Sequence, residues 1–230
     1  MTFESQGYYD RYWSERDWQR TADRSRERGA LALKLLEEGR SRRLLEVGCG
    51  PGWALEVLQA GGFKVQGVDI SLVAVEEARR RSLEVQQADI TTGDFPASDA
   101  PEVIVALEVL EHVLDPFQVL KTLCSRLAPG GQVVVSLPNE LHIAARLQML
   151  VGRLPFGGHD DPHLRHFDRR QQRRLLKAAG YEVQAAVPVS VLPPRWGVAR
   201  APLIPFVHAL PGLFSIATLY LLQIGGGGDE

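Results

Sequence analysis

Cysteine is scarce in this chain, and neither sign of charge is in excess. The 230 residues include two cysteines, and lysine plus arginine (26) nearly balance aspartate plus glutamate (28), giving a formal net charge of −2. Cys49 lies in a glycine-rich turn and Cys124 in a helical pattern that should face the core. We therefore expect both thiols to be reduced and the protein to be cytoplasmic. The near-neutral charge gives no electrostatic reason to expect a nucleic-acid partner.

The sequence gives little indication of a signal peptide or of a membrane-spanning helix. The chain begins with polar residues and lacks the apolar core of a signal peptide. Residues 201–228 are uncharged apart from a protonated His208 and are numerous enough to cross a membrane, but Pro202, Pro205 and Pro211 interrupt them. We predict instead an apolar loop followed by a buried last strand over residues 214–223. Peripheral contact with lipid stays open as an alternative.

The most informative stretch is a glycine-rich turn between a predicted strand and a predicted helix. An apolar run ends in Glu46, and Gly48, Gly50 and Gly52 then alternate. Glycine permits positive φ and lets a ligand approach the backbone closely. About twenty residues later a second strand ends in Asp69, whose carboxylate can accept hydrogen bonds from both ribose hydroxyls. Together these features indicate a βαβ unit that binds a nucleoside cofactor.

The charge at this turn narrows the choice of cofactor. A dinucleotide fingerprint would have its third glycine where this chain has Trp53, and it would hold a pyrophosphate at the helix N-terminus. An anion there would meet Glu46, which suits a cationic or zwitterionic ligand better. A nicotinamide-dependent reductase is therefore the disfavoured interpretation.

Strand-like and helix-like patterns alternate along the chain, which is typical of a doubly wound α/β sheet. The predicted strands are residues 43–47, 64–69, 83–88, 101–106, 131–137, 182–189 and 214–223. The predicted helices are one or two over residues 8–36, and one each over 52–60, 72–81, 116–128 and 169–179, the last with Asp168 as its N-cap. The last strand should pair antiparallel, because no long helix precedes it.

We predict one domain over residues 1–224. Within it, residues 1–40 form an N-terminal helical flap, and residues 138–167 form a long polar insertion suited to substrate recognition. The glycine-rich tail, residues 225–230, is expected to be disordered.

Five short motifs also occur in a recognisable order. They are EVGCGPG at 46–52, GVDIS at 67–71, QADI at 87–90, VIVALE at 103–108, and LAPGG at 127–131 followed by valines 133–135. With these motifs the chain resembles the class I S-adenosylmethionine-dependent methyltransferases. The resemblance implies a Rossmann-like, doubly wound, mostly parallel seven-stranded sheet with an antiparallel last strand and helices on both faces.

The resemblance also implies S-adenosylmethionine as the cofactor, S-adenosylhomocysteine as the product, and a small-molecule acceptor. The cofactor-binding residues that it implies are Glu46, Gly48, Cys49, Gly50, Gly52, Trp53, Asp69, Ile70, Asp89, Ile90, Leu107 and Glu108. Asp89 is the acid expected near the adenine amino group.

A polar cluster after the fourth motif is the candidate catalytic centre. Methyl transfer depends on orientation, and it needs a general base when the acceptor enters protonated. We predict His112 as that base and Glu111 as the acid that orients it; a structural hydrogen-bonded pair is the alternative. Residues 108–113 resemble the E-x-x-E-H segment of ubiquinone-pathway O-methyltransferases, in which such residues can bind a divalent metal. We expect no metal at this segment. Activity measured after treatment with a chelator would distinguish a metal-dependent enzyme from a metal-independent one.

The sequence defines the molecule that would accept the methyl group less well. The predicted substrate residues are Tyr8, Tyr12, His142, Arg146, His163 and Arg165. The apolar stretch 191–214 favours O-methylation of an apolar or lipid-like molecule. Residues 136–153 resemble the methionine-biosynthesis protein W family, which is associated with an acyltransferase partner. A cofactor-fold binding or regulatory protein is therefore the alternative function, and the oligomeric state is not indicated.

Overall fold

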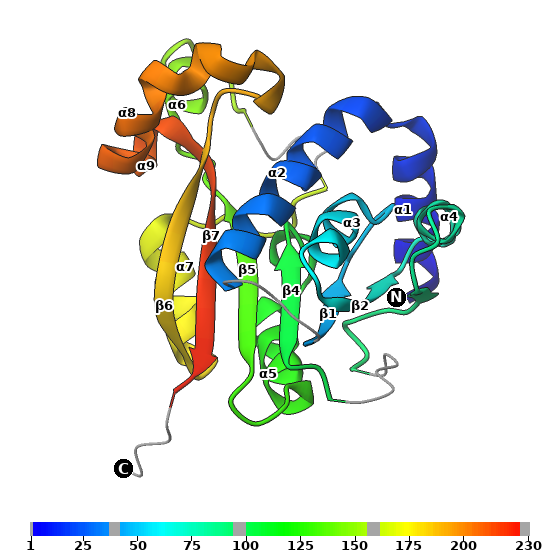
Figure 1. Ribbon diagram of the computed structural model, residues 1–230. Helices are drawn as coiled ribbons and strands as arrows, with labels where there is room; N and C mark the ends of the chain where they lie inside the picture. The colour runs from blue at the N-terminus through cyan, green and yellow to red at the C-terminus, as the bar shows by residue number, and fades with distance from the viewer. Residues whose placement is uncertain (1, 37–41, 94–99, 156–161, 226–230) are drawn as a thin grey trace.

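The central feature of the fold is a seven-stranded sheet with the strand order β3-β2-β1-β4-β5-β7-β6 (Figure 1). The computed structural model describes residues 2–36, 42–93, 100–155 and 162–225. The strands are β1 (Arg43–Val47), β2 (Lys64–Asp69), β3 (Val85–Gln87), β4 (Val103–Leu107), β5 (Gln132–Pro138), β6 (Tyr181–Ser190) and β7 (Ser215–Ile224). β1 to β5 pair in parallel, and β7 runs antiparallel to both β5 and β6. The predicted mixed sheet with an antiparallel last strand is confirmed.

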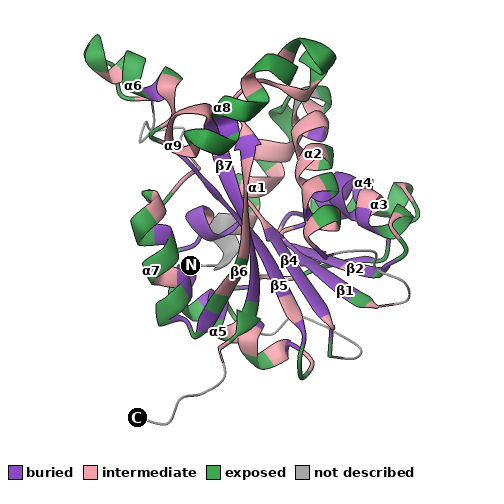
Figure 2. Cartoon of the chain, turned by 60° about the vertical axis from the view of Figure 1, so that its left-hand side comes forward, coloured by how far each residue is buried: buried purple, intermediate pink, exposed green. Residues whose placement is uncertain are grey.

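Helices cover both faces of this sheet. They are α1 (Thr2–Glu15), α2 (Trp18–Leu36), α3 (Trp53–Ala60), α4 (Leu72–Arg80), α5 (Pro116–Arg126), α6 (Ile143–Leu150), α7 (Arg169–Ala178), α8 (Ile204–Ala209) and α9 (Pro211–Phe214), with 3₁₀ helices η1 (Leu110–His112) and η2 (Pro194–Leu203). Side chains alternate between the two faces of each strand. Leu44 and Val134 therefore pack with α2, α3 and α4, while Leu45 and Val135 pack with α5 and α7. The central strands β1, β4, β5 and β7 are buried on both sides (Figure 2).

Side-chain caps set where several helices begin. The Ser71 hydroxyl accepts from the Ala74 amide at the start of α4, and the Asp115 carboxylate accepts from the Gln118 amide at the start of α5. Asp168 forms a full capping box with Gln171, which confirms the predicted N-cap of α7. Such caps satisfy amides that the first helical turn leaves without partners.

The structure differs from the sequence predictions mainly outside the sheet core. The insertion at 138–167 contains the helix α6, and the apolar loop at 191–214 is a run of short helices, η2, α8 and α9. The third strand is shorter than predicted, because residues 83, 84 and 88 do not pair as strand. Parts of the predicted flap (37–40), insertion (156–161) and disordered tail (226–230) lie outside the described residues.

The last strand is buried, as predicted from its apolar composition. Leu219, Tyr220 and Leu222 of β7 are fully inaccessible. Among the helices in the described part of the chain, none combines the length and hydropathy that a membrane crossing requires.

Candidate active site

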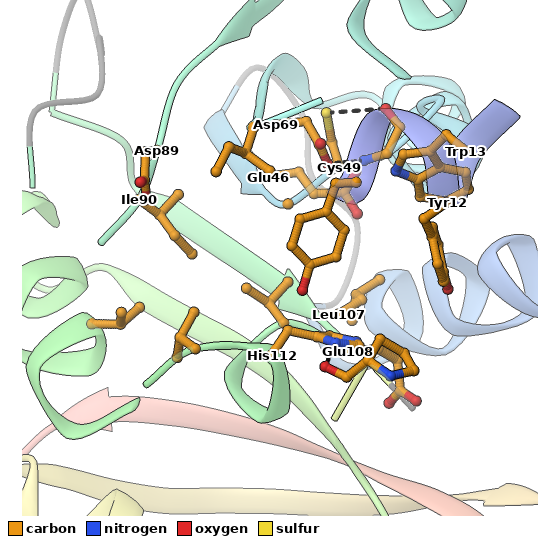
Figure 3. Close-up of a pocket in the computed structure, with 18 of the residues that line it drawn as sticks. Tyr12, Trp13, Glu46, Cys49, Asp69, Asp89, Ile90, Leu107, Glu108 and His112 are labelled. Carbon is orange, nitrogen blue, oxygen red and sulfur yellow. Dashed lines mark hydrogen bonds between the residues drawn. The ribbon is translucent and has the colours of Figure 1, made fainter. Parts of the chain in front are cut away.

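A cavity of about 640 Å³ opens where β1, β2 and β4 end. Parallel strands present their carboxyl ends at the same edge of a sheet, where ligands of doubly wound folds bind. Of the residues predicted from the sequence, the cavity is lined by Tyr12, Glu46, Gly48, Cys49, Gly50, Trp53, Asp69, Ile70, Asp89, Ile90, Leu107, Glu108, His112 and His163. Figure 3 shows Glu46, Cys49 and Asp69 on one side of the cavity and Leu107, Glu108 and His112 across from them.

The glycine turn forms a tight backbone wall of this cavity. Gly48 and Gly50 have φ of 65° and 53°. A Cβ at Gly48 would lie 2.6 Å from Val109, and one at Gly50 would lie 2.8 Å from the Trp13 ring. Gly52, with φ 82°, is instead packed beneath the turn, because its Cβ would meet Leu83 at 2.3 Å. The structure therefore places Gly52 among the residues that shape the turn and outside the cavity lining.

Two buried carboxyl groups lie beside the turn. Glu46 is 2% exposed, and among the described residues its Oε2 atom has no hydrogen-bond partner. Burial raises its pKa well above the usual range, and Asp69 adds to this. Asp69 accepts hydrogen bonds from the Gly50 amide (2.7 Å) and the Ser71 amide (2.9 Å). Burial raises the pKa of Asp69 to about 6, against the opposing effect of those two amides. The Asp69 carboxyl group also lines the cavity.

A third acid lies on the wall after β3. Asp89 accepts hydrogen bonds from the Thr91 amide (2.8 Å) and the Thr91 hydroxyl (2.6 Å), which fix its carboxylate at the cavity rim. The apolar side chain of Ile90 lies beside it in Figure 3. Asp89 thus presents a polar group to the cavity, and Ile90 presents an apolar one.

The N-terminal helix α1 covers the glycine turn. The Trp13 ring lies 6.0 Å from that of Trp53, and Trp18 packs on Trp53 at 5.6 Å. Tyr9 and Tyr12 also line the cavity, whereas Tyr8 is 43% exposed, stacks on Tyr12 and does not line it. The structure thus separates Tyr12 from Tyr8, although both were predicted to contact substrate.

Asp10 fastens this helix to the rest of the fold. Its Oδ1 accepts hydrogen bonds from the Ser71 hydroxyl (2.6 Å) and the Val73 amide (3.3 Å) at the beginning of α4. Helix N-termini favour a negative charge of this kind. Figure 1 shows α1 alongside α4 as a result.

Glu108 forms an ion pair that the sequence did not suggest. Its carboxylate binds the Arg28 guanidinium at 2.8 Å and accepts from the Ser136 hydroxyl at 2.7 Å. The Glu108 amide in turn donates to Ser136 Oγ at 2.8 Å. Glu108 also has φ 57°, an unusual conformation for a residue with a side chain. These contacts hold Glu108 at the cavity wall although its backbone is strained.

His112 has its ring oriented by the segment that follows residue 161. Its Nδ1 lies 3.0 Å from the carbonyl oxygen of Pro162. A carbonyl can only accept, so the neutral ring carries its proton on Nδ1 and presents Nε2 as an acceptor. Burial, the largest effect, lowers the pKa of His112 below its usual value of 6.5. His112 is therefore neutral at pH 7 and able to take up a proton.

Glu111 is fully buried behind His112 and does not line the cavity. Among the described residues neither of its carboxylate oxygens has a hydrogen-bond partner, and Oε1 lies 3.9 Å from His112 Nε2. Burial raises its pKa well above the usual range. Its backbone carbonyl accepts from the amides of Leu164 and Arg165, so residue 111 anchors the chain segment that covers His112.

The other predicted substrate residues have structural contacts. His142 caps α6 by accepting from the Ala145 amide, and Arg146 donates to the Leu141 carbonyl. Arg165 donates to the Leu114 carbonyl. None of these three lines the cavity, but His163 does, with Nδ1 3.1 Å from Glu140 Oε1.

The residues that resemble the methionine-biosynthesis protein W family also serve local structure. Asn139 Nδ2 donates to the carbonyls of Pro211, Gly212 and Ser215 and so joins the end of β5 to α9.

Within the part of the chain that the structure describes, two groups of side chains could hold a metal ion. They are Glu111, His112 and His163, and Glu140, His163 and His166, each with one ligand atom per residue within 4.8 Å of the others. Glu108, the first acid of the E-x-x-E-H segment, belongs to neither group and is bound by Arg28 instead. His159, Asp160 and Asp161, which precede His163 in the sequence, lie outside the described residues.

Comparisons with known proteins agree with this geometry. A family model described as a methyltransferase domain matches residues 12–186. A ubiquinone biosynthesis O-methyltransferase from Alkalilimnicola ehrlichii is 37% identical over 131 residues, which cover 52% of this chain and 53% of the relative. Other relatives of the same description are matched over about half to two thirds of their length.

Two solved structures share the fold over nearly the whole chain. One is a chain of the complex between the Haloferax volcanii Trm112 methyltransferase activator and a methyltransferase, with a TM-score of 0.69, 18% identity, and coverage of 95% of this chain and 98% of that one. The other is magnesium protoporphyrin IX methyltransferase from Synechocystis PCC 6803 with bound SAH, with a TM-score of 0.65, 14% identity, and coverage of 98% and 100%.

The sheet order and the cavity at the carboxyl ends of its strands define a Rossmann-like α/β protein. Within that class, the chain belongs to the methyltransferase-domain family, in the class I S-adenosylmethionine-dependent superfamily.

Proposed function

We propose that this protein transfers the methyl group of S-adenosylmethionine to a hydroxyl oxygen of a small, largely apolar acceptor. The observation that carries the proposal is the arrangement of one cavity. Gly48, Gly50, Glu46 and Asp69, together called the cradle, line one side of it, and the neutral His112 lines the other. The cradle suits the cofactor and the imidazole suits a protonated acceptor.

The cradle fits the cofactor group by group. The Glu46 oxygen without a partner could accept from the ammonium of the methionine part, and Gly48 and Gly50 line the cavity beside it. Asp69 has lone pairs for the ribose hydroxyls, and Asp89 can accept from the adenine amino group. Bound there, the sulfonium supplies an electrophilic methyl group for in-line displacement.

The remaining residues prepare the acceptor and exclude water. His112 Nε2 would take the proton of the hydroxyl, and the Nδ1 contact with Pro162 holds the ring in the tautomer that this requires. Trp13 and Tyr12 close the cavity from the side of α1.

The acceptor side of the cavity supports an apolar substrate. The residues next to His112 that line it are Val109, Val113, Leu114, Val119 and Leu164. The stretch 191–214, which suggested an apolar acceptor at first, contributes no residue to the lining. The argument for an apolar substrate therefore rests on the segments around η1.

Incubation with methyl-labelled S-adenosylmethionine tests the proposal. Phenols and catechols with apolar tails should gain label, whereas sugars and amines of similar size should not. Ser125→Ala, which changes an exposed hydroxyl on α5, is a matched control that should keep full activity. Labelling of amines in preference to hydroxyls would contradict oxygen as the acceptor atom.

We further propose that the transfer needs no metal. Arg28 neutralises Glu108, the acid that a cation at the E-x-x-E-H segment would require. Activity should therefore persist after treatment with a chelator and dialysis. Loss of activity that magnesium restores would show that the metal-dependent alternative is right.

A further inference from the structure

Two segments with exposed apolar side chains leave the sheet at the edge where the cavity opens. They are residues 141–155, which include α6, and residues 191–214, which include η2, α8 and α9. Both project beyond the same end of the sheet, next to one another (Figures 1 and 2). Their exposed apolar side chains include six with accessibilities from 53% to 91%: Leu150, Val151, Leu154, Trp196, Val198 and Phe206.

These segments are fixed to the core, so their exposure is a property of the folded chain. Asn139, at the beginning of the first segment, donates to three carbonyls between residues 211 and 215. Arg24 of α2 donates to the carbonyls of residues 190, 191 and 192, at the beginning of the second. In α8, Val207 is buried while Phe206 faces out, so the helix has one face in contact with the fold.

The charge on the two segments has one sign. Residues 141–155 contain Arg146 and Arg153, residues 191–214 contain Arg195 and Arg200, and neither range contains an acidic residue. Arg200 is paired with Glu27 of α2, whereas Arg146, Arg153 and Arg195 are exposed. The protein as a whole is slightly acidic, so the positive charge is local.

We propose that these two segments dock on a membrane surface that contains anionic phospholipid. Exposed leucine, valine, phenylalanine and tryptophan side chains beside arginines are the composition that binds lipid headgroups and the adjoining acyl region. Each arginine near an anionic surface adds about 1 kcal/mol, or roughly a fivefold gain in affinity. A membrane bound there would lie next to the edge of the sheet at which the cavity opens. The inference does not depend on the proposed methyl transfer.

Co-sedimentation with vesicles tests the proposal on the full chain. The protein should bind vesicles of phosphatidylcholine mixed with phosphatidylglycerol and bind vesicles of phosphatidylcholine alone at least tenfold more weakly. Arg146→Glu with Arg153→Glu should lower binding to the mixed vesicles by roughly 25-fold or more. The matched control is Arg170→Glu with Arg174→Glu, two exposed arginines on α7, which should change binding little.

A second variant tests how much the exposed apolar side chains contribute to membrane binding. Leu150→Ser with Leu154→Ser should weaken binding to the mixed vesicles even at high salt, where the arginine contribution is screened. Leu72→Ser, a partly exposed leucine on α4, is its control. Thermal unfolding checks that every variant is folded.

Three results would overturn the inference. They are a failure of the unaltered protein to bind the mixed vesicles, equal binding to both vesicle types with no effect of the arginine changes, and a dimer in sedimentation equilibrium that Leu150→Ser with Leu154→Ser dissociates. The last result would assign the surface to a second copy of the chain.

Discussion

His112 illustrates how a single contact can decide the chemistry of a residue. The Pro162 carbonyl fixes the proton on Nδ1, and burial keeps the ring neutral near pH 7. Glu111 does not oppose this effect, because burial raises its own pKa and its Oε1 lies 3.9 Å from Nε2, beyond hydrogen-bond distance. The approach of residues 162–165 to η1 is therefore what equips His112 as a base, and the sequence alone gave no sign of it.

Replacement of His112 by alanine should separate catalysis from cofactor binding. We expect kcat to fall by roughly 10² or more, the usual contribution of a general base, while the Kd for S-adenosylmethionine changes less than about twofold. The unaltered enzyme should gain activity as pH rises through the lowered pKa, so its plateau should begin at a lower pH than an unperturbed imidazole would give, because only the neutral ring accepts a proton. In the variant this rise should be absent when kcat is measured with both substrates saturating. Equal losses in kcat and in cofactor affinity would instead make His112 part of the cofactor site.

Glu111 should make stability depend on pH. Burial raises its pKa above the unfolded value of about 4.5, so the folded state holds the proton more tightly than the unfolded state. Its contribution to the free energy of unfolding is fully present below pH 4.5 and is lost as pH rises through the raised pKa. Glu111→Gln removes this titration, so the variant should gain stability relative to the unaltered protein between pH 5 and pH 8. Urea unfolding at both pH values measures the difference.

The exposed Glu76 on α4 provides the comparison for this experiment. Glu76→Gln should shift stability equally at the two pH values. A Glu111→Gln variant with the same behaviour would show that the buried carboxyl does not titrate as described.

At the level of elements, the sequence predicted what periodicity and caps control. β1, β2 and the turn between them match the predicted bounds, because an apolar run, three glycines and a closing acid leave few alternatives. α6 was not predicted because the insertion was interpreted from its polar residues, although Ile143, Leu147 and Leu150 stand at helical spacing. The prolines at 202, 205 and 211 suggested a loop, but Pro205 and Pro211 stand at the first turn of helices, where proline is tolerated.

The candidate site likewise contains residues that the sequence could predict and residues that it could not. The residues on β1, β2 and the loop after β3 were predictable, because a motif places each at a strand end. Arg28, Tyr9 and Trp13 come from helices that fold back over the cavity, and only the tertiary contact between α1 and α4 brings two of them there. Sequence spacing carries no information about that contact.

The attachment of α1 to α4 is itself testable. Asp10→Ala removes the acceptor for the Ser71 hydroxyl and the Val73 amide, a loss comparable to that of an N-cap, about 1 kcal/mol. We expect faster amide hydrogen exchange throughout α1 and a weaker affinity for S-adenosylmethionine, because Trp13 would cover Gly50 less of the time. Glu15→Ala, on the same helix and exposed, should leave both measurements unchanged. Unaltered exchange in Asp10→Ala would mean that the aromatic contacts alone hold the helix.

At the scale of the whole molecule, the strand order determines which residues can meet. With β1 between β2 and β4, the ends of three strands lie side by side, so Glu46, Asp69 and Glu108 border one cavity although 62 residues separate the first from the last. A ligand in that cavity contacts α1, the sheet and η1 together. Its binding free energy should therefore stabilise the entire fold.

Thermal unfolding with S-adenosylhomocysteine measures this coupling. A ligand present at 100 times its Kd stabilises the folded state by about 2.7 kcal/mol, which corresponds to a rise in Tm of roughly 5–10 °C for a chain of this size. NADH should give no such rise, because its pyrophosphate would meet Glu46 at the turn. Asp69→Ala should weaken the binding of S-adenosylhomocysteine by about 1.5–3 kcal/mol, which would remove roughly half to nine tenths of the rise at the same ligand concentration. A shift with NADH that exceeds the shift with S-adenosylhomocysteine would contradict the assignment of the cavity, because an acid at Glu46 and a diphosphate cannot share the turn without a counter-charge.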